Sequence, residues 1–117
     1  MRVLVVDDEP NLRYLLRLLF EVHGHEVDEA GDGEAAIAQI GVRQPDVIVT
    51  DVMMPVMTGR ELIARLRGDP ATAEIPIIVV SASTNIRTIE GGDRVFPKPF
   101  DQDAVLDAAE QLGGHAA

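Results

Sequence analysis

Three short runs of apolar, mostly β-branched residues constrain the fold more than any other feature of this sequence. They are Val3–Val6, Val47–Val49 and Ile77–Val80, and none of them alternates with polar residues. Strands that are buried on both faces read as continuous apolar runs, and such strands belong to parallel sheets covered by helices. The chain is therefore predicted to build a parallel sheet with helices on both faces.

Helical patterns alternate with these runs along the chain. The leucines between positions 12 and 19 recur at intervals of three and four, and Pro10 suits a first helical turn. The repeated order of strand and helix implies right-handed crossovers between parallel strands. Weaker strands are predicted at Glu26–Ala30 and Arg94–Phe96. A second helix opens after Asp32-Gly33, a third ends near Gly68, and Asp101 caps a last helix.

Composition narrows the classes of function. The chain has 117 residues, which fits one domain over residues 1–117, and a formal net charge of -10. Its arginines are scattered, so direct binding of nucleic acid is not expected. The absence of cysteine excludes disulfides, thiolate metal sites and a cysteine nucleophile. No apolar run reaches the roughly 18 residues of a membrane span, so a cytoplasmic protein without membrane insertion is expected.

Polar side chains follow the predicted strands at the point where each one ends. Asp7 and Asp8 follow the first strand, Asp51 the third, Ser81 the fourth and Lys98 the fifth. Ligands of open parallel sheets bind beyond the carboxyl ends of the strands. The five side chains are therefore expected to converge on one edge of the sheet.

The adjacent carboxylates need a positive charge among them. Two carboxylates about 5 Å apart repel each other by roughly 3 kcal/mol at an effective dielectric constant of 20. Mg²⁺ prefers such oxygen ligands and keeps part of its hydration shell. A carboxylate beside Mg²⁺, a lysine and a hydroxyl can also accept a phosphoryl group, which makes Asp51 the candidate nucleophile.

Four motifs resemble the signature blocks of one known family. The motifs are VVDDEPN, DVIVTDVMMPVMTG, IIVVSAS and PKPF, and together they extend over nearly the whole chain. In this order and spacing they resemble the receiver domains of bacterial two-component response regulators. The resemblance implies a flavodoxin-like α/β fold, in which a single doubly wound, five-stranded parallel sheet of order 2-1-3-4-5 is flanked by helices.

The resemblance also implies the roles of the site residues. Asp51 would be phosphorylated by the phosphohistidine of a partner kinase or phosphotransfer protein. Asp8 and Asp51 would hold Mg²⁺ together with the backbone carbonyl of Met53, and Asp7 would contribute through water. Ser81 and Lys98 would bind the phosphoryl oxygens. Such a chain promotes only its own phosphorylation and dephosphorylation and is not an enzyme with an external substrate. It changes the binding of a downstream protein through its fourth and fifth strand-helix region.

Two departures from the family concern the signalling face. Only 16 residues separate Ser81 from Lys98, so a shortened or irregular fourth helix is expected within the stretch TNIRTIEGGD. Many receivers place an aromatic residue three positions before the lysine, where this chain has Val95, and strand alternation should turn Phe96 to the opposite face. The bond between Lys98 and Pro99 is predicted to be cis, as in the family.

Other interpretations are weaker. The acids at positions 7–9 could have no role beyond capping the first helix. An aspartyl-nucleophile phosphatase resembles this site, but it normally carries a second aspartate where Met53 stands. A flavin or nucleotide binder needs a phosphate loop rich in glycine or hydroxyl groups after the first strand. A pseudo-receiver that only binds partners stays open because of the short crossover.

Overall fold

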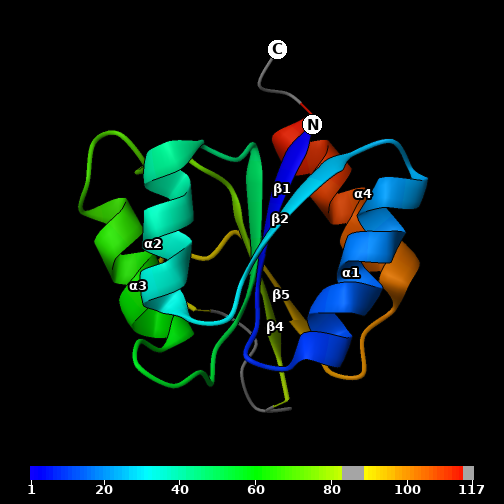
Figure 1. Cartoon of the computed structure of the whole chain (residues 1–117), viewed down its shortest axis with the longest axis horizontal. Helices are drawn as coiled ribbons and strands as arrows, with labels where there is room; N and C mark the ends of the chain where they lie inside the picture. Colours follow the sequence, from blue (N-terminus) through cyan, green and yellow to red (C-terminus); the bar gives the residue numbers. More distant parts are fainter. Residues whose placement is uncertain (83–88, 115–117) are drawn as a thin grey trace.

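Five parallel strands form one sheet in the order β2-β1-β3-β4-β5, with helices on both faces (Figure 1). The computed structural model describes residues 1–82 and 89–114. The order is the one that the family resemblance implied, so the predicted fold class is confirmed. The strands are Arg2–Val6 (β1), Glu26–Ala30 (β2), Val47–Asp51 (β3), Ile77–Ser81 (β4) and Arg94–Pro97 (β5), and the helices are Pro10–Val22 (α1), Gly33–Val42 (α2), Gly59–Arg67 (α3) and Gln102–Gly113 (α4).

Each face of the sheet has its own apolar core. Helices α2 and α3 cover one face, and α1 and α4 cover the other (Figure 1). Alternate residues of β1 divide between the cores, so that Leu4 packs on the α2–α3 side and Val5 on the α1–α4 side. In β5, Val95 packs against the first core and Phe96 against the second, which confirms the predicted alternation.

Side-chain caps fix where three of the helices begin. Asp32 accepts a hydrogen bond from the amide of Ala35 at the start of α2. Thr58 and Glu61 form a reciprocal capping box at the start of α3. Asp101 caps α4, as its position in the sequence predicted. Such caps stabilise a helix by about 1 kcal/mol each, and they fix the residue at which the chain enters each helix.

The connection between β4 and β5 is short. The predicted fourth helix falls largely on residues 83–88, which lie outside the described residues. The described part, residues 89–93, forms a turn in which the amide of Gly92 donates to the carbonyl of Ile89 and Gly91 has a φ of 84°. Ile89 is buried in the α2–α3 core, so this turn is anchored to the body of the protein.

No helix within residues 1–82 and 89–114 is both long and apolar enough to cross a membrane.

Helix α3 begins in direct contact with the end of β3. The amide of Gly59 donates to the carbonyl of Val52 at 2.8 Å. A Cβ atom at Gly59 would lie 2.9 Å from the Cα of Val52 and would collide with the carbonyl oxygen of Asp51. Only glycine lets the helix approach the backbone of Asp51 this closely.

We therefore expect Gly59→Ala to lower the free energy of unfolding by about 2 kcal/mol, because the added methyl group must displace the β3 backbone or the helix. Urea denaturation measures this change. Gly41→Ala in α2 is the matched control, since a Cβ there meets nothing within 4 Å. The control should gain about 0.5 kcal/mol from the better helix propensity of alanine. Equal effects at the two positions would contradict the close contact at Gly59.

Candidate functional site

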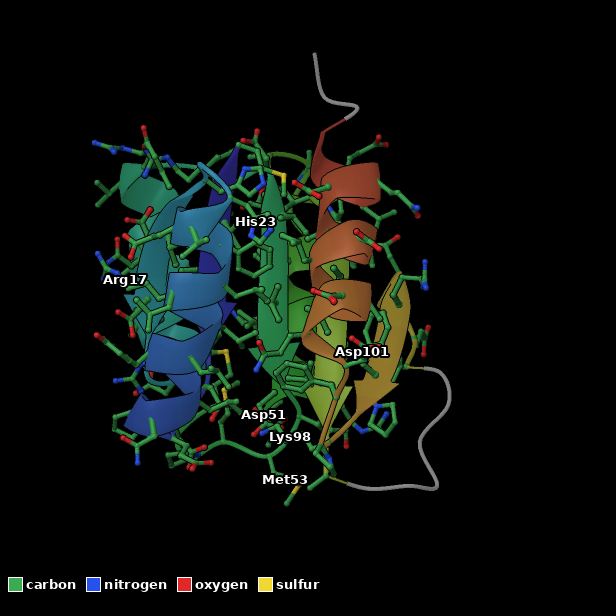
Figure 2. The ribbon with its side chains drawn as sticks, turned by 90° about the vertical axis from the view of Figure 1, so that its right-hand side faces the viewer. Arg17, His23, Asp51, Met53, Lys98 and Asp101 are labelled. Atoms are coloured by element: carbon green, nitrogen blue, oxygen red, sulfur yellow. The ribbon has the colours of Figure 1, made fainter. Side chains whose placement is uncertain are left out.

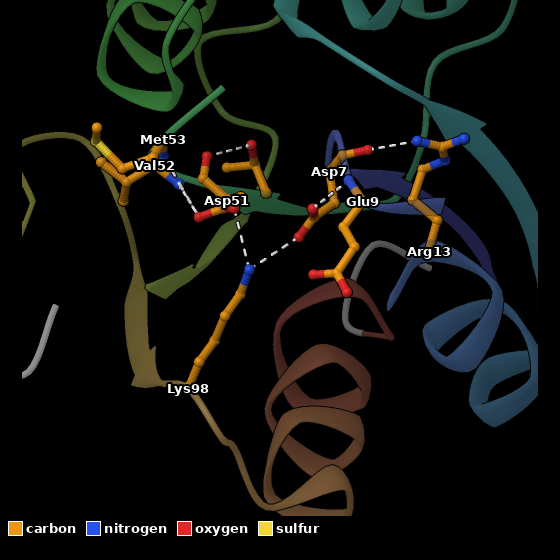
Figure 3. A network of polar contacts seen from close by, with 8 residues as sticks. Asp7, Glu9, Arg13, Asp51, Val52, Met53 and Lys98 are labelled. Carbon is orange, nitrogen blue, oxygen red and sulfur yellow. Dashed lines mark hydrogen bonds and ion pairs between the residues drawn. The ribbon is translucent and has the colours of Figure 1, made fainter. Parts of the chain in front are cut away.

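The carboxyl ends of β1, β3 and β5 bring three charged side chains into contact. The ammonium group of Lys98 lies 3.1 Å from Oδ2 of Asp7 and 3.0 Å from Oδ2 of Asp51 (Figure 3). Figure 2 shows Asp51, Lys98 and Met53 at the same end of the sheet. The predicted convergence of side chains from different strands is therefore present, and Lys98 lies between two acids.

Both the side chain and the backbone of Asp7 make hydrogen bonds. Its side chain is 1% exposed, and its Oδ1 accepts a hydrogen bond of 2.9 Å from the amide of Glu9. Its backbone amide donates to the carbonyl of Ala30, and its carbonyl accepts from Nη1 of Arg13 at 2.6 Å. The contact with Arg13 was not predicted, because the sequence does not distinguish Arg13 from Arg17 one helical turn later.

Asp51 uses its two carboxylate oxygens differently. Oδ1 accepts the amide of Val52 at 2.7 Å and faces the amide of Met53 at 3.4 Å, whereas Oδ2 contacts Lys98. The hydroxyl of Thr50 donates to the Asp51 carbonyl at 3.0 Å. The carboxylate is therefore fixed by the backbone that follows it, and one oxygen points toward the lysine at the strand ends.

The acids could hold a divalent cation. Asp7, Asp8 and Asp51 each offer a carboxylate oxygen, and these oxygens lie within 4.8 Å of one another. Two oxygens on opposite sides of one Mg²⁺ are about 4.2 Å apart, twice the usual bond length. The donors therefore lie close enough for a small rearrangement, or an intervening water, to place them around one Mg²⁺. Asp8 is exposed, which leaves that side of the cluster open to a hydrated ion.

The other two predicted residues lie near this cluster. Ser81 is the last residue of β4 and is 1% exposed, and its carbonyl accepts the backbone amide of Lys98 at 2.7 Å. Met53 is 73% exposed. The roles predicted for the Ser81 hydroxyl and the Met53 carbonyl stay predictions. The peptide bond between Lys98 and Pro99 is cis, which confirms that prediction.

Burial and neighbouring charges shift the pKa values of two groups. Burial raises the pKa of Asp7 above its ordinary value, and the charge of Asp51 raises it further, although the Glu9 amide and Lys98 oppose the change. Burial lowers the pKa of Lys98, but hydrogen bonds to Asp51 and Asp7 outweigh this and leave the pKa raised. The lysine therefore stays charged at neutral pH, while burial, and to a smaller extent the charge of Asp51, makes Asp7 easier to protonate.

The loop that follows Asp51 contains a strained turn. Val56 has a φ of 68°, and the amide of Met57 donates to the carbonyl of Pro55 at 2.7 Å. A β-branched residue is rarely found at positive φ. A tight three-residue turn of this kind was not expected from the motif MMPVMTG.

Known proteins share both the sequence and the fold of this chain. A family model described as Response regulator receiver domain matches residues 3–110. The DNA-binding dual master transcriptional regulator RpaA of Synechocystis sp. is 34% identical over 95% of this chain and 48% of its own length. Protein PilH of Pseudomonas aeruginosa is 33% identical over 90% of this chain and 91% of its own length.

A solved structure shows the same architecture. The response regulator protein TrrA from Thermotoga maritima in complex with Mg²⁺ and BeF has a TM-score of 0.86 and 31% sequence identity, over 95% of this chain and 97% of TrrA. This chain spans less than half the length of several curated relatives that it matches, RpaA among them.

We expect Asp7→Asn to raise the free energy of unfolding by about 1 kcal/mol at pH 7 without divalent cations, because it removes a buried charge that Asp51 repels. Folding raises the pKa of Asp7, so the wild-type chain loses stability as the pH rises from the ordinary value of 3.8 through the folded pKa. The advantage of the variant should therefore grow over that window and be small below it. Urea denaturation at several pH values measures this.

Asp107→Asn on the exposed face of α4 is the control and should change stability by less than about 0.5 kcal/mol. An Asp7→Asn variant that is less stable than the wild type at pH 7 would show that the ion pair with Lys98 outweighs the cost of the buried, repelled charge.

Proposed function

The chain belongs to the response regulator receiver domain family, and we propose that it accepts a phosphoryl group on Asp51 from the phosphohistidine of a sensor kinase or phosphotransfer protein. The observation that carries the proposal is the contact of Asp51 Oδ2 with Lys98 beside the acids of β1. That arrangement gives a carboxylate nucleophile, a fixed cation and a set of oxygen donors at one edge of the sheet.

The reaction is a transfer between two nucleophiles. An oxygen of Asp51 attacks the phosphorus atom, the bond from phosphorus to the imidazole nitrogen breaks, and the imidazole leaves with the electron pair. Lys98 already lies beside the attacking carboxylate and would pair with the incoming phosphoryl oxygens. Ser81 at the end of β4 would donate its hydroxyl to the same group. The result is a mixed anhydride on Asp51, which water can later hydrolyse.

Mg²⁺ is the proposed cofactor of this transfer. Asp8, Asp51 and the backbone carbonyl of Met53 would hold the ion, and Asp7 would contribute through water. The three carboxylates supply the oxygen donors that Mg²⁺ prefers, and these oxygens lie within 4.8 Å of one another. When bound, Mg²⁺ neutralises charge on the carboxylates and on the phosphoryl oxygens.

We further propose how this reaction serves a signalling role. Residues 1–117 act as one receiver domain that promotes only its own phosphorylation and dephosphorylation. Phosphorylation changes binding to a downstream protein through β4, β5 and the segments that follow them, because Ser81 ends β4 and Lys98 directly follows β5. The proposed location is the cytoplasm, where a kinase has access to ATP. No direct contact of this chain with nucleic acid is proposed.

An exposed apolar stripe on α1 is the proposed docking surface for the phosphohistidine donor. Tyr14, Leu15, Leu18 and Val22 are between 40% and 78% exposed. Leu15 also lines a groove of about 470 Å³ together with Lys98 and Phe100. Residues at spacings of three and four pack against a second helix. A helical donor on this stripe would reach the groove that borders Lys98, which contacts Asp51.

Acetyl phosphate tests the chemistry without a protein partner. Intact-protein mass should show one added phosphoryl group on the wild-type chain in the presence of Mg²⁺ and much less without it. Asp51→Asn should abolish the adduct, and Asp107→Asn, which changes an exposed aspartate of α4, should retain it. An adduct that persists in Asp51→Asn would place the acceptor elsewhere. No adduct from acetyl phosphate or from a phosphohistidine protein would reject the proposed function.

We expect Leu18→Glu to lower kcat/KM for transfer from a phosphorylated histidine kinase by about tenfold or more, because a charge on the apolar stripe opposes helix packing. The rate with acetyl phosphate should not change. Val42→Glu is the matched control, since Val42 is 82% exposed on α2 and lies outside the stripe. Unchanged transfer in Leu18→Glu from a kinase that phosphorylates the wild-type chain would exclude this docking surface.

A further inference from the structure

Strand β5 leads directly into Lys98 and is an edge strand of the sheet. It has four residues, and it lies at the edge, where it pairs only with β4. Its residues are exposed or half-buried, whereas every residue of β3 and β4 is buried. Only Val95 and Phe96 of this strand pack against the cores, and both are half-buried, so side-chain burial fixes its register less firmly than that of β3 and β4.

One arginine holds the entry to β5 from the side of α3. Nε of Arg67 donates to the carbonyl of Gly91 at 2.9 Å, and Nη2 contacts Oδ2 of Asp93 at 3.1 Å. Nη1 donates to the carbonyls of Ala73 and Ile75 at 2.8 Å and 2.7 Å, just before β4. All three nitrogens of the guanidinium group are engaged, so Arg67 links the starts of β4 and β5. We call Arg67 and Asp93 with these contacts the Arg67 clamp.

Asp93 sets how β5 pairs with β4. Its amide donates to the carbonyl of Ile77 at 2.8 Å, and its Oδ2 accepts the amide of the same Ile77 at 2.7 Å. From this point the pairing continues to Ser81 opposite Pro97, and the amide of Lys98 then donates to Ser81. A slip by one residue would move Lys98 by about 3.3 Å and exchange the faces of β5.

The turn before Asp93 packs closely against the side chain of Arg67. Gly91 has a φ of 84°, and a Cβ at this position would lie 2.7 Å from Cγ2 of Ile63 and 3.2 Å from Cγ of Arg67. The stem of Arg67 therefore packs directly against the glycine whose carbonyl its Nε binds. Contacts with four backbone or carboxylate oxygens need the fork of an arginine, which a single lysine ammonium group cannot reproduce.

We propose that Arg67 and Asp93 are positioning residues for the phosphoryl transfer, because the clamp fixes the register of β5 and thereby holds the Lys98 ammonium group between Asp7 and Asp51. Neither residue touches the reacting atoms, since both lie at the opposite end of the strand. The kinetic part of this inference rests on the proposed function, but the placement of Lys98 does not.

Lys98 is the only lysine in the chain, which gives a direct readout of its placement. Labelling with ¹³C-lysine yields one side-chain spin system. In the wild type, the two Hε protons should be inequivalent and shifted, because the group is held between two carboxylates. In Arg67→Met the signals should collapse toward those of a free lysine, and Arg65→Met, an exposed arginine of the same helix, should leave them unchanged.

The rate of phosphorylation provides a second readout. Asp7, Asp8 and Asp51 come from the ends of β1 and β3, which the clamp does not touch. We therefore expect Arg67→Met to slow phosphorylation by saturating acetyl phosphate by about tenfold, while the binding of Mg²⁺, followed by amide NMR shifts, is not weakened. A variant that was only less stable would show slower phosphorylation and weaker apparent Mg²⁺ binding, each in proportion to its folded fraction.

The outcomes separate this inference from the proposed function. Unchanged Lys98 signals and an unchanged rate in Arg67→Met overturn the positioning role. A wild-type chain with ordered Lys98 signals that accepts no phosphoryl group from any donor overturns the proposed function instead. If Arg67→Met does not fold, Asp93→Asn serves in its place. It keeps an oxygen for the Ile77 amide but removes the charge that Arg67 pairs with, and it should give the same changes at smaller size.

Discussion

The contact of one ammonium group with two buried carboxylates is the interaction on which the site depends. Asp7 and Asp51 have side chains that are 1% and 9% exposed, and they face each other across the ends of neighbouring strands. Buried charges of like sign are costly unless a partner compensates them. Lys98 supplies that compensation from the other side of β4. The carboxylates can therefore remain charged and close together in the folded chain, at the place where a cation and a phosphoryl group are proposed to bind.

The sheet order divides this site into a fixed part and an adjustable part. Strands β1 and β3 each pair with a neighbour on both sides, so hydrogen bonds on both sides fix the backbone that leads to Asp7 and Asp51. Strand β5 pairs on one side only, and it leads directly into Lys98. Small changes at the edge therefore move the lysine without disturbing the acids. The Arg67 clamp, which we propose fixes β5, contacts Gly91 and Asp93 at the end of the short connection from β4 to β5.

Much of this arrangement could be predicted from the sequence, and the part that could not has a physical reason. Apolar runs revealed the strands, and the ends of those runs placed Asp7, Asp51 and Lys98 together, because parallel strands share an edge. The Arg67 clamp and the contact of Arg13 with Asp7 were not predicted. Most of their acceptors are backbone carbonyls, which every residue carries, so no spacing of residue types marks them. The positive φ of Val56 was missed because its residue type argues against it.

Helix α3 connects the two parts of the site along its own length. Its first residue, Gly59, packs on the backbone of Asp51, and its last residue, Arg67, holds the turn that leads into β5. A helix of nine residues spans about 13 Å, so the Asp51 carboxylate and the anchor of the edge strand are joined by one rigid element. Any displacement of α3 at Asp51 must therefore also act on the register of β5. Because Lys98 directly follows β5, a shift of the strand would also move the ammonium group of Lys98 within the site.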